Sequence, residues 1–233
     1  GIRDRDVTGV QTCALPIFDN VYYADKDESN KKNKEVWMNK GRFRCWEYTP
    51  YDETIVLDTD YMVNSSKLLN VFDFYDDFAT HNSTSFVMRP DAPQERMSNL
   101  SYTTLWATVM FFKKTSRTKQ IFECLEMIQK NYDHYANIHN FVAGLYRNDY
   151  GLSMALRLVN GQTENKRDYI PWSLLHVGQN TKVYKNDDWM YNTEYTIMFD
   201  NWTKGKIRKE YITIKDTDFH IMNKQNFLEL VND

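Results

Sequence analysis

The sequence predicts an α/β fold, and two patterns along the chain indicate it. Short runs of apolar and β-branched residues alternate with segments whose apolar residues recur at helical spacing. Residues 54–57 are the clearest strand, because strands of a parallel sheet read as continuous apolar runs. Residues 116–132 are the clearest helix, and their apolar positions are Ile121, Phe122, Leu125 and Ile128.

The remaining elements follow in chain order. We expect further strands at residues 18–24, 36–38, 86–88, 105–112, 183–184, 196–199 and 211–214. We expect further helices at residues 41–48, 65–72, 139–146, 149–158 and 227–231. Pro50 would close the first of these helices, Asn64 or Ser65 would cap the second, and Gly161 would end the one that begins at Asp149. Residues 25–34 and 91–100 are polar and predict loops.

Residues 1–17 need a separate interpretation, because they resemble a translated sequencing adapter with Arg5-Asp6 at the place of a short index. A secretory signal would have an uninterrupted apolar region, whereas this stretch contains Gln11, Thr12 and Pro16. We therefore expect the native sequence to begin near Phe18, truncated at its N-terminus, and to form a single domain over residues 18–233.

Composition excludes several classes of protein. Without the adapter-like segment, Cys45 and Cys124 remain, and they form neither a zinc-binding spacing nor a disulfide framework. A reducing compartment, the cytoplasm, fits this best. The net charge of −3 argues against general binding of nucleic acid. The longest apolar run, around residues 105–112, is too short to span a membrane, so no transmembrane segment is expected.

Asp58 and Asp60 are the strongest candidates for a functional site. They follow the apolar run at residues 54–57, and residues i and i+2 of a strand point to the same face. Two adjacent carboxylates repel each other, so the pair predicts a site for Mg²⁺ or Mn²⁺, ions that usually accompany phosphates. The same spacing recurs without a preceding strand-like run at Asp4/Asp6, Asp25/Asp27 and Asp216/Asp218.

Residues 49–60 read Thr-Pro-Tyr-Asp-Glu-Thr-Ile-Val-Leu-Asp-Thr-Asp and resemble the metal-binding strand of nucleotide-sugar glycosyltransferases. Residues 105–113, 146–156 and 219–224 resemble later segments of the same superfamily, most closely its glycogenin-like, lipopolysaccharide and phage-type members. The resemblance implies the Rossmann-like GT-A fold, with a mixed, mostly parallel sheet flanked by helices. The first strand of that fold has no counterpart here, which agrees with truncation.

The resemblance implies an enzyme that transfers a sugar from a nucleotide-diphosphate donor to an acceptor of unknown chemistry. Mn²⁺ or Mg²⁺ would be held by Asp60, with Asp58 contributing through the metal or the ribose of the donor. His220 would be a third metal ligand, or alternatively a surface or hydrogen-bonded histidine. Lys224 would offset phosphate charge, or alternatively be an ordinary solvated lysine.

Asp149, together with Asn148, is the catalytic candidate. Asp149 would act as the base of an inverting reaction or orient the sugar in a retaining one, and capping of the predicted helix is the alternative for this pair. Two other functions stay open. One is a two-metal nucleotidyltransferase. The other is a catalytically impaired protein of the same fold that binds carbohydrate or nucleotide, since the truncated fragment itself could be inactive.

Overall fold

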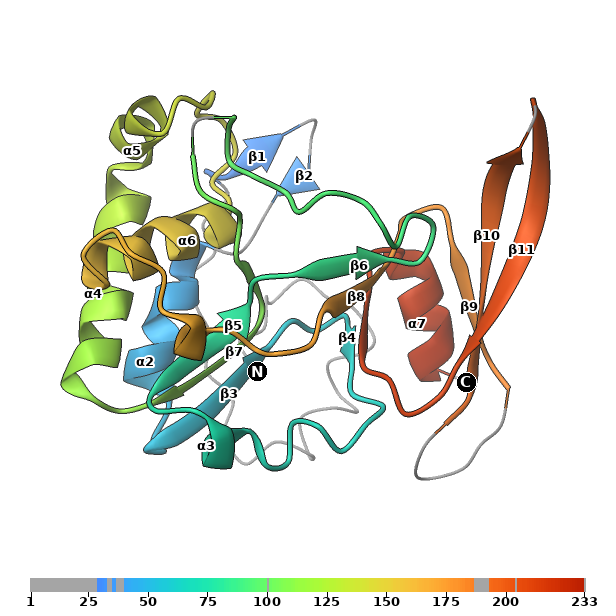
Figure 1. Ribbon diagram of the computed structural model, residues 1–233, viewed down its shortest axis with the longest axis horizontal. Helices are drawn as coiled ribbons and strands as arrows, with labels where there is room; N and C mark the ends of the chain where they lie inside the picture. The colour runs from blue at the N-terminus through green and yellow to red at the C-terminus, as the bar shows by residue number, and fades with distance from the viewer. Residues whose placement is uncertain are drawn as a thin grey trace. The chain divides into compact units, whose positions relative to one another are not determined.

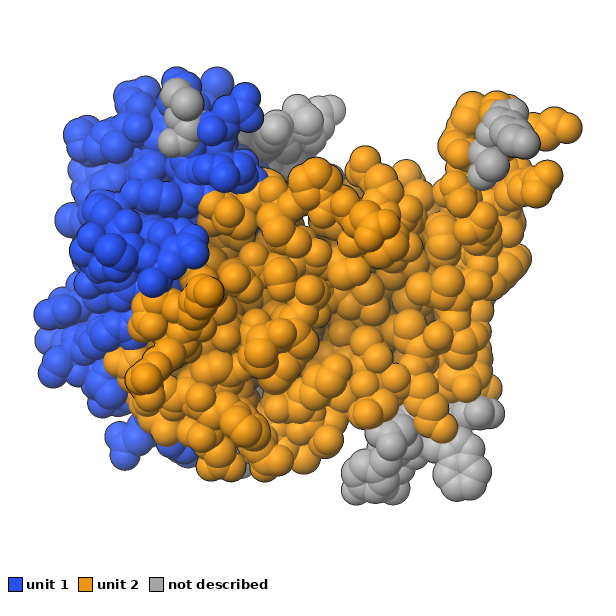
Figure 2. All heavy atoms as spheres, viewed as in Figure 1, with its two compact units in different colours: residues 1–54, 96–102, 114–164 blue, residues 55–95, 103–113, 165–233 orange. Residues whose placement is uncertain are grey.

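The computed structural model describes residues 29–32, 35–36, 40–99, 101–186, 193–203 and 205–232. The chain forms two compact units that interleave along the sequence, shown in blue and orange in Figure 2. Unit 1 comprises Gly1–Thr54, Arg96–Tyr102 and Lys114–Glu164, and unit 2 comprises Ile55–Glu95, Thr103–Lys113 and Asn165–Asp233. The adapter-like segment and the strand expected at residues 18–24 lie outside the described residues.

Unit 1 is mainly helical (Figure 1). Its elements are β1 (Lys31–Lys32), β2 (Glu35–Val36), η2 (Lys40–Arg44), α2 (Cys45–Tyr48), α4 (Ser116–Lys130), α5 (Tyr132–Ile138) and α6 (Asn148–Val159). The helix expected at residues 41–48 is confirmed, with its first half in the tighter 3-10 form. The loop expected at residues 25–34 contains one strand of the small antiparallel hairpin β1–β2.

Helix α4 begins and ends as its sequence dictates. The Thr115 side chain accepts a hydrogen bond from the Thr118 backbone N–H. The Thr118 side chain accepts one from the Thr115 backbone N–H, which completes a capping box. The four apolar residues predicted from helical spacing are all buried. The backbone turns at Asn131, so the predicted helix ends at Lys130 and α5 follows it as a separate helix.

The helix expected at residues 139–146 was wrong, since this segment has no helical turn and α5 lies just before it. Asn140 adopts a positive φ of 52°, a conformation that ends helices. Val142 is exposed, whereas Phe141 packs against Tyr132 and Tyr150, so the segment packs as a loop and not as an amphipathic helix. Helix α6 confirms the helix predicted at residues 149–158. Gly161, with a φ of 63°, follows the end of this helix as expected.

Gly151 lies in the first half of α6 and allows Tyr146 to approach the helix. A Cβ at this position would lie 2.6 Å from the Tyr146 hydroxyl oxygen and 3.0 Å from a methyl carbon of Leu125. The hydroxyl donates to Asn148 across 3.4 Å, and both residues are buried. The close contact therefore lies inside packed structure rather than at a surface.

We expect Gly151→Ala to lower the free energy of unfolding by about 1 kcal/mol in urea denaturation, because overpacking costs about 1–3 kcal/mol while the gain in helix propensity is about 1 kcal/mol. Gly41→Ala is the control, since a Cβ at residue 41 meets nothing within 4 Å. A Gly151→Ala protein as stable as the wild type would contradict this prediction.

Unit 2 holds most of the strands. They are β4 (Tyr61–Met62), β5 (Phe78–His81), β6 (Thr84–Phe86), β7 (Trp106–Lys113), β8 (Leu174–Val177), β9 (Lys182–Lys185), β10 (Tyr195–Thr203), β11 (Lys206–Ile214) and β12 (Phe219–Ile221). Its helices are α3 (Val71–Phe74), η3 (Lys166–Asp168) and α7 (Lys224–Asn232). Strand β3 (Glu53–Leu57) begins in unit 1 and ends in unit 2.

The described strands of these two units form sheets in the orders β3-β7-β5, β4-β12-β8-β6 and β11-β10-β9. Strands β6 and β12 run parallel to β8, whereas β4–β12, β5–β7, β9–β10 and β10–β11 are antiparallel. The α/β class is confirmed, with sheets that are mixed rather than mostly parallel. Of the antiparallel pairs, only β9–β10 and β10–β11 join strands that follow each other in the chain, whereas β4–β12 and β5–β7 join strands that are separated by other elements.

Three further expectations for unit 2 need correction. Strand β3 is half-buried at the edge of its sheet, whereas β7 lies in the middle and is buried along nearly its whole length. The helix expected at residues 65–72 is replaced by turns and bends over residues 65–70, and a short helix, α3, begins only at Val71. Strand β6 begins and ends two residues before the strand expected at residues 86–88. The predicted helix near the C-terminus is confirmed as α7 and begins earlier.

Two clusters of buried side chains form the core of unit 2. The first joins the β7 sheet to α3 and to the segment before β8, and its buried members are Tyr61, Leu68, Val71, Ala79, Trp106, Val109, Phe111, Ile170 and Leu174. The second joins β8 and β12 to the sheet β11-β10-β9 through Val177, Val183, Tyr195, Ile197, Phe219 and Ile221. No helix in the described part of the chain combines the length and apolar character needed to cross a bilayer.

Candidate metal centre

Asp58 and Asp60 lie in the turn between β3 and β4. The Asp58 backbone N–H donates to the Thr108 carbonyl of β7 across 2.9 Å, and the Tyr61 N–H donates to the Asp58 carbonyl across 3.1 Å. The two carboxylates converge through this turn and not, as expected, through the alternation of a strand, because β3 ends at Leu57. Asp60 is buried and Asp58 half-buried.

Strand β12 brings His220 to the same place. Tyr61 pairs with His220 across the β4–β12 ladder, and the Ile221 N–H donates to the Asp60 carbonyl across 2.9 Å. The Nε2 atom of His220 lies 3.2 Å from an Asp60 carboxylate oxygen. One ligand atom each from Asp58, Asp60 and His220 lie within 4.8 Å of one another. These are oxygen and imidazole ligands of the kinds that Mn²⁺ accepts.

Lys224 approaches the other side of Asp60. It is the first residue of α7, and its Nζ lies 2.7 Å from the second carboxylate oxygen of Asp60. Its side chain is mostly exposed, so it can leave this carboxylate without opening the core. The four residues that the sequence suggested for metal and phosphate therefore lie together, although residues 58 and 224 are far apart in the chain.

Two neighbours of Asp60, His220 and Lys224, determine the charge state of its carboxyl group. Burial alone would raise the pKa of Asp60, but the hydrogen bonds and charges of His220 and Lys224 hold that pKa well below its usual range. Asp60 is therefore ionised throughout the physiological pH range. An ionised, partly desolvated carboxylate is a strong ligand for a divalent cation.

A second histidine, His176 of β8, lies behind His220. The two Nδ1 atoms are 2.9 Å apart, and His176 is fully buried between the rings of Phe86 and Trp106. Burial, together with the neighbouring His220, lowers the pKa of His176 to about 3, so His176 is neutral. A neutral His176 can accept the Nδ1–H of His220, which leaves Nε2 of His220 directed at Asp60. Such outer partners orient metal-binding histidines.

Sequence reasoning missed this role of His176. The residue follows two leucines, and β8 was not predicted. Only the parallel pairing of β8 with β12 places His176 opposite His220. His81 of β5 is a further buried histidine whose pKa is lowered by burial to about 4, and its Nδ1 lies 2.9 Å from the Trp172 carbonyl.

Asn148 and Asp149 belong to unit 1, whereas the metal candidates belong to unit 2. Asn148 is buried, and its side-chain amide nitrogen has no hydrogen-bond partner within the described residues. Asp149 faces the Arg147 guanidinium across 3.7 Å and is partly exposed. The N-cap of α6 is Arg147, which makes no side-chain capping bond, so neither candidate caps the helix. Their catalytic role stays a prediction.

The Asp216/Asp218 pair does not belong to the metal cluster. Asp218 is buried and accepts a 2.7 Å hydrogen bond from the Asn64 backbone, which ties the segment after β4 to the segment before β12. Asn64 therefore serves this tie rather than capping a helix. Asp216 lies in a turn with a φ of 49°. The Asp4/Asp6 and Asp25/Asp27 pairs lie outside the described residues.

Comparison with models of protein families, with curated proteins and with solved structures gives no match. What is proposed for this chain therefore depends on its own residues and on their geometry. The centre formed by Asp58, Asp60, His220 and Lys224 carries most of that argument.

Proposed function

We propose that this chain is a metal-dependent glycosyltransferase of the GT-A fold that takes its sugar from a nucleotide-diphosphate donor. The observation that carries the proposal is the convergence of Asp58, Asp60 and His220, with Lys224 on the same carboxylate. The two aspartates come from one end of β3 and the other two residues from the C-terminal segment. The resemblance named all four residues independently of any contact between them.

The residues fit the chemistry of a leaving diphosphate. Asp58, Asp60 and the Nε2 atom of His220 would hold Mn²⁺ or Mg²⁺, and a bound ion would neutralise the developing charge on the diphosphate. Lys224, released from Asp60, would add a positive charge to the same group. Asp149 would serve as the base of an inverting reaction or as a residue that orients the sugar.

A two-metal nucleotidyltransferase fits less well. Such an enzyme would place a third carboxylate beside the two aspartates, whereas here the third ligand among the described residues is an imidazole. We therefore favour glycosyl transfer, with a single divalent cation.

Isothermal titration calorimetry tests the proposal. We expect the chain to bind Mn²⁺, and to bind a uridine- or guanosine-diphosphate sugar only while Mn²⁺ is present, because the carboxylates and the diphosphate repel each other without it. The same titration with excess EDTA is the control. Absence of metal-dependent binding for every nucleotide-sugar would contradict the proposal, and tighter binding of sugar-free nucleoside triphosphates would favour nucleotidyl transfer.

A further inference from the structure

Strands β10 and β11 form a ribbon that extends beyond the rest of their sheet (Figure 1). The two strands pair along their full length, from Tyr195 opposite Ile214 to Thr203 opposite Lys206. Strand β9 pairs with β10 only as far as Met198. The outer part of the hairpin is therefore a two-stranded ribbon without a third strand in the described structure.

The register divides the side chains of this sheet between two faces. One face contributes Val183, Tyr195 and Ile197 to the second core cluster. Alternate residues lie on the opposite face. The pairs Trp202–Ile207, Met198–Tyr211 and Thr196–Tyr184 lie on this opposite face, which therefore carries the apolar side chains of Tyr184, Trp202, Ile207 and Tyr211. The Asp200–Lys209 pair lies on the same face, between Trp202–Ile207 and Met198–Tyr211.

This face is turned to solvent. The exposed fractions are 71% for Trp202, 57% for Ile207, 60% for Tyr211 and 44% for Tyr184. Trp202 and Ile207 lie directly opposite each other, one pair before the hairpin turn. Large apolar side chains that gather on one exposed face mark an interaction surface.

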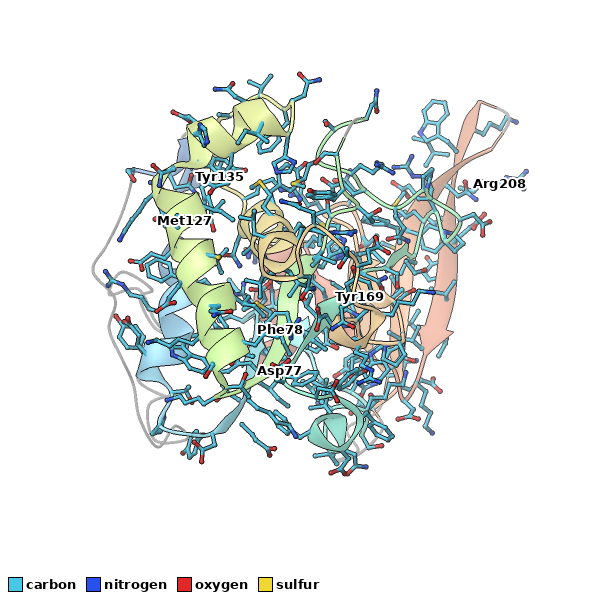
Figure 3. The ribbon with its side chains drawn as sticks, turned by 60° about the vertical axis from the view of Figure 1, so that its left-hand side comes forward. Asp77, Phe78, Met127, Tyr135, Tyr169 and Arg208 are labelled. Atoms are coloured by element: carbon cyan, nitrogen blue, oxygen red, sulfur yellow. The ribbon has the colours of Figure 1, made fainter. Side chains whose placement is uncertain are left out.

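The charge near the tip is positive on balance, because residues 200–210 contain four basic residues and two acidic ones, Asp200 and Glu210, although the chain as a whole carries −3. Residues 202–209 read Trp-Thr-Lys-Gly-Lys-Ile-Arg-Lys, with four basic residues and no acidic one. Lys206, Arg208 and Lys209 are exposed, and the register places Lys209 on the face of Trp202 and Ile207, whereas Lys206 and Arg208 lie on the other face of the ribbon. Figure 3 shows Arg208 on the outer side of the hairpin, extending away from it.

We propose that this ribbon docks on the surface of an anionic lipid bilayer. Trp202 and Ile207 would enter the boundary between headgroups and acyl chains, and Tyr211 and Tyr184 would lie in the headgroup layer. Lys209 on the same face, together with the long side chains of Lys206 and Arg208 from the other face of the two-stranded ribbon, would contact anionic headgroups. Ile207 argues against a nucleic-acid platform, because an aliphatic side chain opposite the tryptophan cannot stack on a base. This surface is separate from the metal centre and does not depend on glycosyl transfer.

Flotation with lipid vesicles tests this proposal on the full 233-residue chain. The vesicles contain phosphatidylcholine alone, or phosphatidylcholine with an equal part of phosphatidylglycerol. We expect binding to the mixed vesicles that weakens as salt is added. Trp202→Ala with Ile207→Ala should lower the partition coefficient at least about tenfold. Lys206→Gln and Lys209→Gln should each lower it about fivefold.

Two matched variants distinguish binding through the ribbon from non-specific binding of other exposed apolar or basic side chains. Phe74→Ala removes an equally exposed ring from α3, and Lys166→Gln removes an exposed lysine from η3. Both should bind as the wild type does. In addition, brominated acyl chains should quench tryptophan fluorescence in the wild type but not in Trp202→Phe. No binding to mixed vesicles, equal loss in the control variants, or Trp202-dependent binding to single-stranded nucleic acid instead of vesicles would overturn the proposal.

Discussion

Replacing Asp60 by asparagine should weaken binding of Mn²⁺ at least about a hundredfold, because loss of a direct ligand costs more than the 10–100-fold loss that follows removal of an outer partner. Asparagine keeps the shape of the side chain but removes its charge. The variant leaves Lys224 facing a neutral amide, so the positive charge of this lysine would no longer be offset and would repel the incoming ion. Metal-dependent binding of a nucleotide-sugar should disappear with the ion.

The matched control is Asp216→Asn, in the other described Asp-x-Asp sequence. Asp216 lies in a left-handed turn that asparagine accepts, and it lies outside the three-residue metal cluster. Titration of Mn²⁺ followed by manganese electron paramagnetic resonance would compare the two variants, and thermal melting would show that both are folded. Wild-type affinity in a folded Asp60→Asn protein would contradict the metal centre described above.

Acid should destabilise the chain well above the pH at which carboxylates titrate. The pKa of His81 falls from 6.5 to about 4 and that of His176 from 6.5 to about 3, in both cases mainly through burial. The unfolded chain therefore takes up protons below about pH 6.5 that the folded chain excludes. We expect the free energy of unfolding to fall by about 3 kcal/mol per histidine between pH 7 and pH 4.

Urea denaturation at several pH values measures this dependence. His81→Phe keeps a ring of similar size and removes one titrating group, so it should reduce the slope of stability against pH in this window by about half. His134→Gln, an exposed histidine of α5, is the control and should leave the slope unchanged. A wild-type protein equally stable at pH 7 and pH 4 would show that these histidines are not held neutral.

The long elements β7 and α4 were predictable from the sequence, whereas the short strands β4 and β12 beside the candidate site were not. β7 and α4 have enough residues to show an apolar run or a helical period. β4 has two residues and β12 three, which is too short for alternation to be recognised. Such strands exist because of their pairing partners, and pairing between residues 61 and 220 cannot be derived from local pattern.

The same distinction applies to the candidate site. Asp58 and Asp60 were identified from an apolar run that ends in two carboxylates, and that signal is local. His220 and Lys224 were suggested by resemblance, since neither stands out from its neighbours. His176 was missed because its importance comes from one parallel strand pairing, which sets its ring beside that of His220.

The position of β12 has a consequence for how the protein is made. This strand follows β4, β6 and β8 in the chain, yet it lies inside their sheet, between β4 and β8. Until a ribosome has released residues 219–221, β4 and β8 each present an unpaired edge, and His220 and Lys224 have not reached Asp60. Assembly of the metal centre therefore waits until residues 219–224 have been synthesised. A prematurely terminated chain would lack the centre and would carry two open edges for chaperones to recognise.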